Sequence, residues 1–326
     1  MKNFEYANPT SVKEALGLLG NTWDDAQVLA GGTDILSLMK DYVVSPKRLV
    51  NVKNIKELGG IAKSGGGWRI GATVTMDEIA TNAQIRAAYP SLHEAATGIA
   101  SAQIRNMGTV GGDLCQRPRC WYFRGGHGLL AKGANGQSLV PNGQNEYHAI
   151  FGAGPAYFVS ASSLGPALIA LGAKINVASN AGNHDVDADK FFVNPKDDMT
   201  REIALKPNEI VTGITLPAPS GKNATYEVRY REAVDWPVAT ASVVLKMKGS
   251  AVESASIVMG HVAPTPWRAS QAEQMLTGKK VDAAVAEEAG KAAVANATAL
   301  SGNAHKIQLA KVAVKRAILA AAGVKA

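Results

Sequence analysis

Cysteine is scarce in this chain, with only Cys115 and Cys120 among 326 residues. Two thiols cannot build the disulfide framework that holds small secreted domains together, so the sequence favours a reducing compartment. The chain also lacks any apolar run of the roughly 18 residues that a membrane-spanning helix needs. Glu5 and Glu14 interrupt the N-terminal stretch, which does not resemble a secretory signal. We therefore expect a cytoplasmic protein.

Aromatic residues are few, at 6% of the chain, and no stretch combines them with a stripe of basic charge. The formal net charge is +7, but Lys and Arg are spread thinly, and the longest basic pairs lie in PKR at 46–48 and GKK at 278–280. A nucleic-acid-binding surface needs clustered positive charge beside aromatic rings. We therefore expect a basic, mixed surface and no nucleic-acid partner.

The composition predicts two domains. Hydrophobic residues make up 46% of the chain, which is enough for substantial cores. The best boundary signal is ITLPAPSGKN at 214–223, where two prolines precede a run of small polar residues. We predict a first domain over residues 1–220, divided into parts 1–57 and 58–220, and a second domain over 221–326.

Local patterns indicate mixed α and β structure in both domains. Ser11 and Glu14 have capping-box spacing before an apolar helical stripe, and Thr75 and Glu78 repeat that spacing. Between these caps we expect strands at 26–32 and 48–52, separated by a turn or short helix. The second domain is expected to hold two strands joined around Gly249–Ser250 and three helices, at 267–276, 281–298 and 305–322. Residues 101–150 lack any period, and such long irregular segments are usually functional or disordered.

Two glycine-rich stretches are the strongest functional signal. VLAGGTDI at 28–35 and IRNMGTVGGDL at 104–114 each place glycines beside a threonine and just before an aspartate. Neither matches the G-x-G-x-x-G fingerprint or the P-loop. One such stretch alone is best explained as a tight turn, but successive glycine N–H groups also form anion-binding nests. The two together predict a diphosphate ligand gripped from two sides.

These two stretches belong to an ordered set that also contains SSLGPALIALGA, KPNEIVTGITLP and HVAPTPWRASQAEQML. The set resembles the FAD-binding (medium) subunit of the molybdenum hydroxylases, the xanthine dehydrogenase and aldehyde oxidoreductase family, over essentially the whole chain. The resemblance implies a mixed α/β and α+β fold. A two-part FAD-binding domain of the vanillyl-alcohol oxidase type would be followed by a small α+β domain with a short antiparallel sheet and helices.

The resemblance also implies cofactor-binding residues, none of which is a catalytic acid or base. The diphosphate would lie along Val28, Leu29, Ala30, Gly31, Gly32, Thr33, Asp34 and Ile35. Ile99 and Ala100 would flank the flavin or its chain, and Val211 would lie near the isoalloxazine. The ribityl and phosphate atoms would follow Thr109, Gly112, Asp113 and Gln116.

Two positions depart from the pattern of the family. Ser163 stands where many relatives have an aspartate that contacts the adenosine part of FAD, and a serine offers a neutral, weaker contact. Glu227 stands where relatives often have lysine, which would reverse a charge near the flavin.

The resemblance implies partners for this chain. A large subunit would carry the molybdenum cofactor, and a small subunit would carry the [2Fe–2S] clusters. FAD in this chain would take electrons from those clusters and pass them to an acceptor that the sequence does not identify. Complexes of this family can be exported on a signal peptide that a partner subunit carries. A periplasmic location is therefore the alternative to the cytoplasmic one.

The segment CQRPRCWYFR at 115–124 resembles a loop in which some relatives hold a [4Fe–4S] cluster. Such a cluster generally needs four thiolates, and the chain has two, so we expect no cluster and no metal here. Trp, Tyr and Arg in this loop favour a contact surface.

Two other functions stay open. One is a stand-alone flavin oxidase or dehydrogenase, which would need its own substrate pocket and base. The other is a scaffold subunit that has lost redox activity, an alternative that Ser163 and Glu227 leave open.

Overall fold

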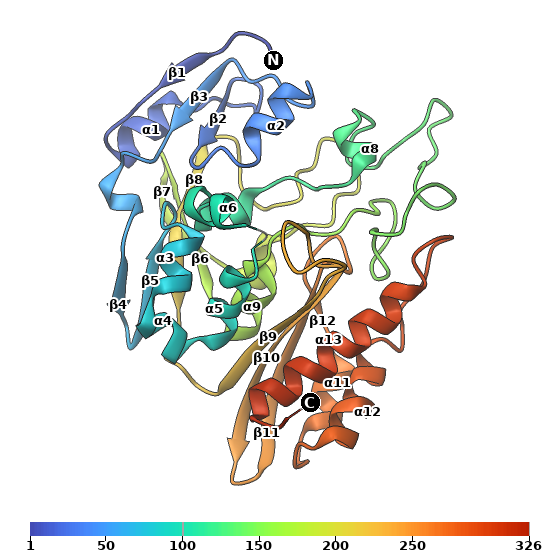
Figure 1. Cartoon of the computed structure of the whole chain (residues 1–326). Helices are drawn as coiled ribbons and strands as arrows, with labels where there is room; N and C mark the ends of the chain where they lie inside the picture. Colours follow the sequence, from blue (N-terminus) through green and yellow to red (C-terminus); the bar gives the residue numbers. More distant parts are fainter. Residues whose placement is uncertain (100, 326) are drawn as a thin grey trace.

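The structure of the chain is a computed structural model that describes residues 1–99 and 101–325. Its fold is built around three sheets (Figure 1). The first sheet is parallel, with strand order β1 (Glu5–Ala7), β3 (Arg48–Asn51), β2 (Ala26–Leu29). Helices α1 (Val12–Leu18) and α2 (Ile35–Lys40) connect these strands. The predicted strand–helix–strand opening is therefore present, with α2 beginning just after the first glycine pair.

The second sheet has order β4-β5-β8-β6-β7, and all its neighbouring strands are antiparallel. These strands are β4 (Ile61–Ser64), β5 (Gly67–Gly71), β6 (Lys174–Ser179), β7 (Gly182–Asp187) and β8 (Glu209–Leu216). The short helix η1 (Lys56–Leu58) precedes β4, and the helices between the strands are α3 (Met76–Thr81), α4 (Ala83–Ala88), α5 (Pro90–Thr97), α6 (Ala102–Met107), α7 (Val110–Cys115), α8 (Trp121–Arg124), α9 (Leu164–Leu171) and α10 (Ala188–Phe191). Side chains of β5 and β8 pack with those of α3, α5 and α9 in one large core.

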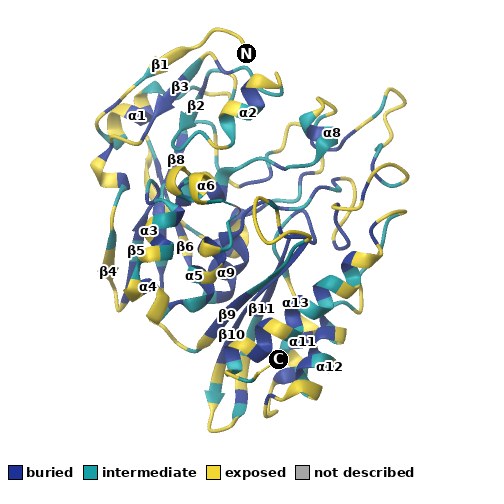
Figure 2. Ribbon diagram, viewed as in Figure 1, coloured by how far each residue is buried: buried dark blue, intermediate teal, exposed yellow. Residues whose placement is uncertain are grey.

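The third sheet is antiparallel, with order β12-β11-β10-β9. Its strands are β9 (Lys222–Val228), β10 (Ala239–Lys248), β11 (Ala251–Gly260) and β12 (Trp267–Arg268), followed by α11 (Ser270–Leu276), α12 (Ala283–Ala293) and α13 (His305–Ala322). Alternate residues of β10 face opposite cores: Val244 packs with the core of the second sheet, and Val243 and Leu245 pack with the C-terminal helices. In Figure 2 the halves of β10 and β11 far from their connecting turn are buried, and the ends next to that turn are more exposed.

Small residues let the C-terminal helices approach closely. A Cβ atom on Gly290 of α12 would lie 2.7 Å from the carbonyl oxygen of Lys311 on α13, so only glycine fits there. Ala286, Ala289 and Ala293 are buried on the same helix. The alanine-rich stretches are thus packed helices, as their apolar stripes predicted, and the mixed α/β and α+β fold class is confirmed.

Several local predictions need correction. The capping box at Thr75 and Glu78 is complete, but Glu14 reaches back to Thr10 and not to Ser11. The helix expected from residue 267 begins at Ser270, because Trp267 and Arg268 pair with β11 as β12.

Residues 101–150 hold α6, α7 and α8, so they are not structureless. Phe123, Leu129 and Leu130 also form a small core with Leu38 of α2. Among the described residues no helix is both long and apolar enough to cross a membrane.

Candidate functional site

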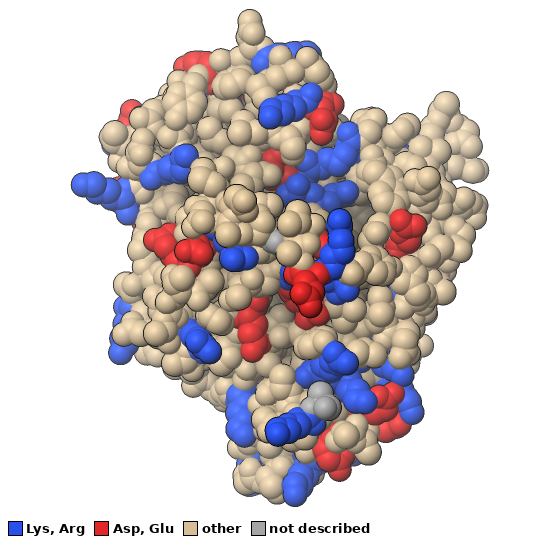
Figure 3. All heavy atoms as spheres, in the orientation of Figure 1, with Lys and Arg blue, Asp and Glu red and all other residues tan. Residues whose placement is uncertain are grey.

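A cleft lies where the first sheet meets the second, and both glycine-rich stretches line it. It holds about 1010 Å³ of empty space, its open mouth included. Its walls include the start of α2, the start of α7, the end of α7 and part of β8. In Figure 3 basic atoms gather at the hollow in the middle of the visible face.

Close packing of the backbone explains the first glycine of the pair, and backbone conformation explains the second. A Cβ atom on Gly31 would lie 1.7 Å from the carbonyl oxygen of Met107, because the turn after β2 passes directly against the end of α6. Gly32 has φ +74°, a left-handed conformation that side chains disfavour. The N–H groups of Gly31, Gly32 and Thr33 have no acceptor among the described residues. The turn therefore presents free backbone donors to the cleft.

The second glycine stretch forms the opposite wall. Thr109 caps α7 by accepting a hydrogen bond from the Gly112 N–H at 3.1 Å. Gly111 packs against Ala72, the residue after β5: its N–H donates to the Ala72 carbonyl at 2.8 Å, and a Cβ would lie 3.1 Å from the Ala72 Cβ. Two separate turns thus converge on one space, as the pattern predicted.

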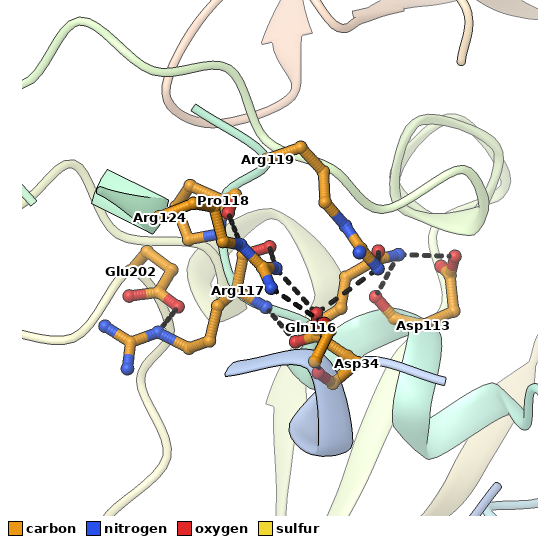
Figure 4. Close-up of polar contacts among 9 residues, drawn as sticks. Asp34, Asp113, Gln116, Arg117, Pro118, Arg119, Arg124 and Glu202 are labelled. Carbon is orange, nitrogen blue, oxygen red and sulfur yellow. Dashed lines mark hydrogen bonds and ion pairs between the residues drawn. The ribbon is translucent and has the colours of Figure 1, made fainter. Parts of the chain in front are cut away.

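Asp34 ties the cysteine-containing segment to this wall (Figure 4). Its carboxylate accepts from the Arg117 N–H at 2.8 Å and from Nη2 of Arg124 at 2.6 Å, and Nη2 of Arg119 lies 3.3 Å away. Arg124 also donates to the Ser37 hydroxyl of α2. The side chain of Asp34 is therefore occupied by arginines of its own chain.

A second arginine group, Arg117 and Arg201, lines the cleft. Nε of Arg117 is 2.5 Å from Oε1 of Glu202, and Nε of Arg201 is 3.8 Å from Oε2. The Arg201 guanidinium stacks over Trp23 at 4.1 Å from the ring centre. Burial lowers the pKa of Arg201 to about 10, so it stays charged at neutral pH. Sequence reasoning missed Arg117, Arg201 and Trp23, although three arginines within 117–124 were a visible signal.

The structure brings most of the expected cofactor-binding residues to this cleft. Those that line it are Val28, Ala30, Gly31, Gly32, Thr33, Asp34, Ile35, Thr109, Gly112, Gln116 and Val211. Leu29 lies in β2 beside them. Asp113, Ser163 and Ile99 are not among the lining residues. Ala100 lies outside the described residues.

Asp113 is buried behind the cleft, where it holds α7 to α9. Its oxygens accept from the Ser162 hydroxyl at 2.5 Å, the Ser163 N–H at 3.2 Å and the Leu164 N–H at 3.1 Å. Burial raises the pKa of this carboxyl, and the same hydrogen bonds oppose that rise. Ser163 is itself buried at the start of α9.

Glu227 is paired inside the protein. Its carboxylate forms an ion pair with Arg229, whose guanidinium also donates to the Gly98 carbonyl. Burial raises the pKa of Glu227, and Arg229 opposes the rise. Next to Gly98 and Ile99 the two charges therefore compensate each other, so Glu227 does not bring an unbalanced negative charge to this region.

The two cysteines have different neighbours. Burial raises the pKa of the Cys115 thiol to about 12, so it stays protonated. Sγ of Cys120 lies 3.1 Å from Nε2 of His148. Across the described residues no three His, Cys, Asp or Glu side chains are grouped as metal ligands would be. That no [4Fe–4S] cluster binds here stays a prediction.

Buried histidines predict an acid-sensitive fold. Burial, followed by the nearby Lys306 ammonium, lowers the pKa of His148 to about 4 and that of His261 to about 3. The unfolded chain binds protons below about pH 6.5 while the folded chain does not, so stability is lost as the pH falls from 6.5 towards 4 and 3. We expect urea unfolding to lose about 1.4 kcal/mol per pH unit for each histidine in this window.

The matched variants isolate this effect. The double variant His148→Gln, His261→Gln should flatten the slope between pH 6.5 and 4.5, whereas His184→Asn on the exposed strand β7 should leave it unchanged. An unchanged slope in the double variant would contradict the assignment.

The residues of the cleft fit a ligand that carries an anionic group. Free backbone N–H groups at one turn and the buried arginine side chains that line the cleft are donors suited to phosphate. Apolar walls of Leu19, Val52 and Ile210 suit a flat ring system at the ends of such a ligand. An FAD molecule combines both kinds of group.

Comparison with known proteins gives two matching family models. "FAD binding domain in molybdopterin dehydrogenase" matches residues 2–219, and "CO dehydrogenase flavoprotein C-terminal domain" matches residues 224–323. The carbon monoxide dehydrogenase medium chain of Hydrogenophaga pseudoflava is 33% identical over 323 residues, covering 98% of this chain and 96% of that protein. The aldehyde oxidoreductase FAD-binding subunit of Escherichia coli is 30% identical, covering 85% and 87%.

Solved structures agree with these matches. A carbon monoxide dehydrogenase from Hydrogenophaga pseudoflava that lacks the Mo-pyranopterin moiety of its cofactor gives a TM-score of 0.77 at 31% identity, covering 98% of this chain and 97% of that chain. Quinoline 2-oxidoreductase from Pseudomonas putida 86 gives 0.76 at 26% identity, covering 99% of both chains.

Proposed function

We propose that this chain, which belongs to the family of FAD-binding medium subunits of molybdenum hydroxylases, passes electrons from the [2Fe–2S] clusters of a small partner subunit through FAD to a terminal acceptor. The observation that carries the proposal is the convergence of two glycine-rich turns on one cleft, with free N–H groups on one of them. The molybdenum cofactor would lie in a large partner subunit, where substrate is oxidised.

The FAD diphosphate would be held between the two turns. Gly31, Gly32 and Thr33 would donate backbone hydrogen bonds to it, and the start of α7 at Thr109 and Gly112 would face it from the other side. Ile99 and Ala100 would flank the flavin, and Val211 would lie near the isoalloxazine. Ser163 would contact the adenosine part only after a rearrangement, because its side chain is buried.

The chain's own part is to bind and orient the cofactor. Bound FAD supplies the redox chemistry, since it can take up and release electrons singly or in pairs. The Glu227–Arg229 pair keeps the region beside Gly98 close to neutral charge, and Asp34 holds the segment with Arg117 and Arg124 against the cleft. We propose a cytoplasmic location, with co-export on a partner subunit as the alternative.

An absorption spectrum tests the proposal. We expect the purified chain, alone or with its large and small partner subunits, to show flavin bands and to release FAD on denaturation. The chain purified alone should contain no iron above background. In the assembled complex, reduction of the [2Fe–2S] clusters should be followed by reduction of FAD, and an added acceptor should then reoxidise the flavin. A protein that stays colourless with added FAD beside its partners would favour the scaffold alternative. Flavin reduction by a small substrate without partners would favour a stand-alone oxidase or dehydrogenase.

A further inference from the structure

The wall of the cleft holds a buried guanidinium group whose hydrogen bonds the chain itself does not satisfy. The Arg201 side chain is 11% exposed, and neither its Nε nor its Nη1 atom has a hydrogen-bond acceptor among the described residues. Its nearest carboxylate oxygen, on Glu202, lies 3.8 Å from Nε, which is too far for a hydrogen bond. A buried donor without an acceptor is costly, and a buried charge more so.

Glu202 is already committed to another arginine. Its Oε1 atom lies 2.5 Å from Nε of Arg117, so a single carboxylate faces two guanidinium groups. Glu209, a glutamate on the cleft wall, accepts from the Lys206 N–H at 2.9 Å and pairs with the Lys206 ammonium at 3.9 Å. The one carboxylate of Glu202 is therefore shared between Arg117 and Arg201, and Glu209 is held by Lys206.

The wider cluster also carries more positive than negative charge. Asp34 accepts from Arg124 and lies close to Arg119, as described above. The guanidinium groups of this region are Arg117, Arg119, Arg124 and Arg201, and its carboxylates are Asp34, Asp113 and Glu202. Arg201 is therefore the guanidinium group best placed to bind an anion from outside the chain.

We propose that Arg201 is a specific binding residue for the FAD diphosphate, held in place by Trp23 and aided by Arg117, so that the anion is bound by a guanidinium as well as by the glycine turns. Arg201 and Arg117 line the same cleft as Gly31 and Gly32. Stacking on Trp23 fixes the guanidinium plane while leaving its edge donors free, which suits bidentate binding of phosphate oxygens. This inference rests on the proposed function, because it assumes FAD in the cleft.

The test compares Arg201→Met with wild type in the FAD-free full-length chain. Met retains an unbranched apolar side chain beside Trp23 but has no charge. We expect the dissociation constant of FAD to rise about 10- to 100-fold, the range of a charge-assisted hydrogen bond. Arg201→Lys should give an intermediate value. Arg86→Met, an exposed arginine on α4, is the matched control and should bind FAD as wild type does.

Two ligand fragments locate the effect. ADP carries the diphosphate and adenosine lacks it, so in competition with FAD only ADP should bind more weakly to Arg201→Met. Equal weakening of adenosine would mean that Arg201 acts on the base and would overturn the proposal. The thermal midpoint of the FAD-free variant should not fall, since an unpaired buried cation has been removed. A fall in that midpoint with unchanged FAD and ADP affinity would also overturn it and would assign Arg201 a structural role.

The outcome is separable from that of the proposed function. If wild type binds no FAD, the proposed function fails. If wild type and Arg201→Met bind FAD equally well, only the assignment of Arg201 fails.

Discussion

Gly31→Ala is expected to leave the purified protein largely without FAD. The added Cβ would lie 1.7 Å from the Met107 carbonyl oxygen, about half the separation that unbonded atoms tolerate. The obstructing backbone is anchored, because the Gly108 N–H donates to the Ile104 carbonyl and the Gly108 carbonyl accepts from the Met76 N–H. The turn after β2 must therefore move away from α6, and the two glycine stretches separate.

The magnitude follows from overpacking, which costs about 1–3 kcal/mol where a well-packed backbone must shift. If that cost is relieved in the FAD-free state and imposed on binding, the dissociation constant of FAD rises about 10- to 100-fold or more. Equilibrium dialysis of the FAD-free chain, with flavin fluorescence as the readout, measures it.

Gly17→Ala is the matched control. Gly17 lies within α1, and a Cβ atom there would meet nothing within 4 Å. Removing a glycine from a helix should stabilise the fold by about 0.5–1 kcal/mol and leave FAD affinity unchanged. FAD retained at wild-type affinity in Gly31→Ala would mean that this turn does not form part of the cofactor site.

The convergence of the two turns could be foreseen because each turn has a local cause. Glycines end β2 and begin α7, and threonine–glycine spacing gives the N-cap of α7. The β10–β11 hairpin and the alanine-rich helices were likewise encoded by short-range alternation and periodicity. In each case neighbouring residues decide the backbone conformation, so a single sequence contains the information.

The arginine clusters could not be foreseen in the same way. Arg117 and Glu202 come from distant parts of the chain, and each lies in an irregular segment whose path no periodicity indicates. The partners of Asp34 could not be predicted either. Its place after two glycines predicts a cofactor contact, yet its carboxylate contacts Arg117, Arg119 and Arg124. Side-chain pairing depends on where the loop folds back, which the tertiary structure alone decides.

Asp113→Ala is expected to be the most destabilising change near the cleft. Asp113 follows the second glycine stretch, but its carboxylate is directed to the first N–H groups of α9 and to the Ser162 hydroxyl. Alanine leaves the Ser163 and Leu164 N–H groups buried without an acceptor. Each of these two groups costs about 1–3 kcal/mol, so we expect the free energy of unfolding of the FAD-free chain in urea to fall by about 2–6 kcal/mol.

Two further variants separate the loss of the hydrogen bonds between Asp113 and α9 from the general effect of losing a negative charge. Asp113→Asn keeps one carbonyl oxygen in place and should lose about half as much stability, because one acceptor remains for the start of α9. Asp189→Ala removes an exposed aspartate of α10 and should change the unfolding free energy by no more than about 0.5 kcal/mol.

The same measurement also bears on the cleft. Since α7 carries Thr109 and Gly112, and Asp113 fixes α7 to α9, loss of the carboxylate should loosen the glycine wall and weaken FAD binding together with the fold. If Asp113→Ala lost FAD affinity with no loss of stability, Asp113 would be a direct ligand of the cofactor, and its hydrogen bonds to α9 would be exchangeable for bonds to FAD.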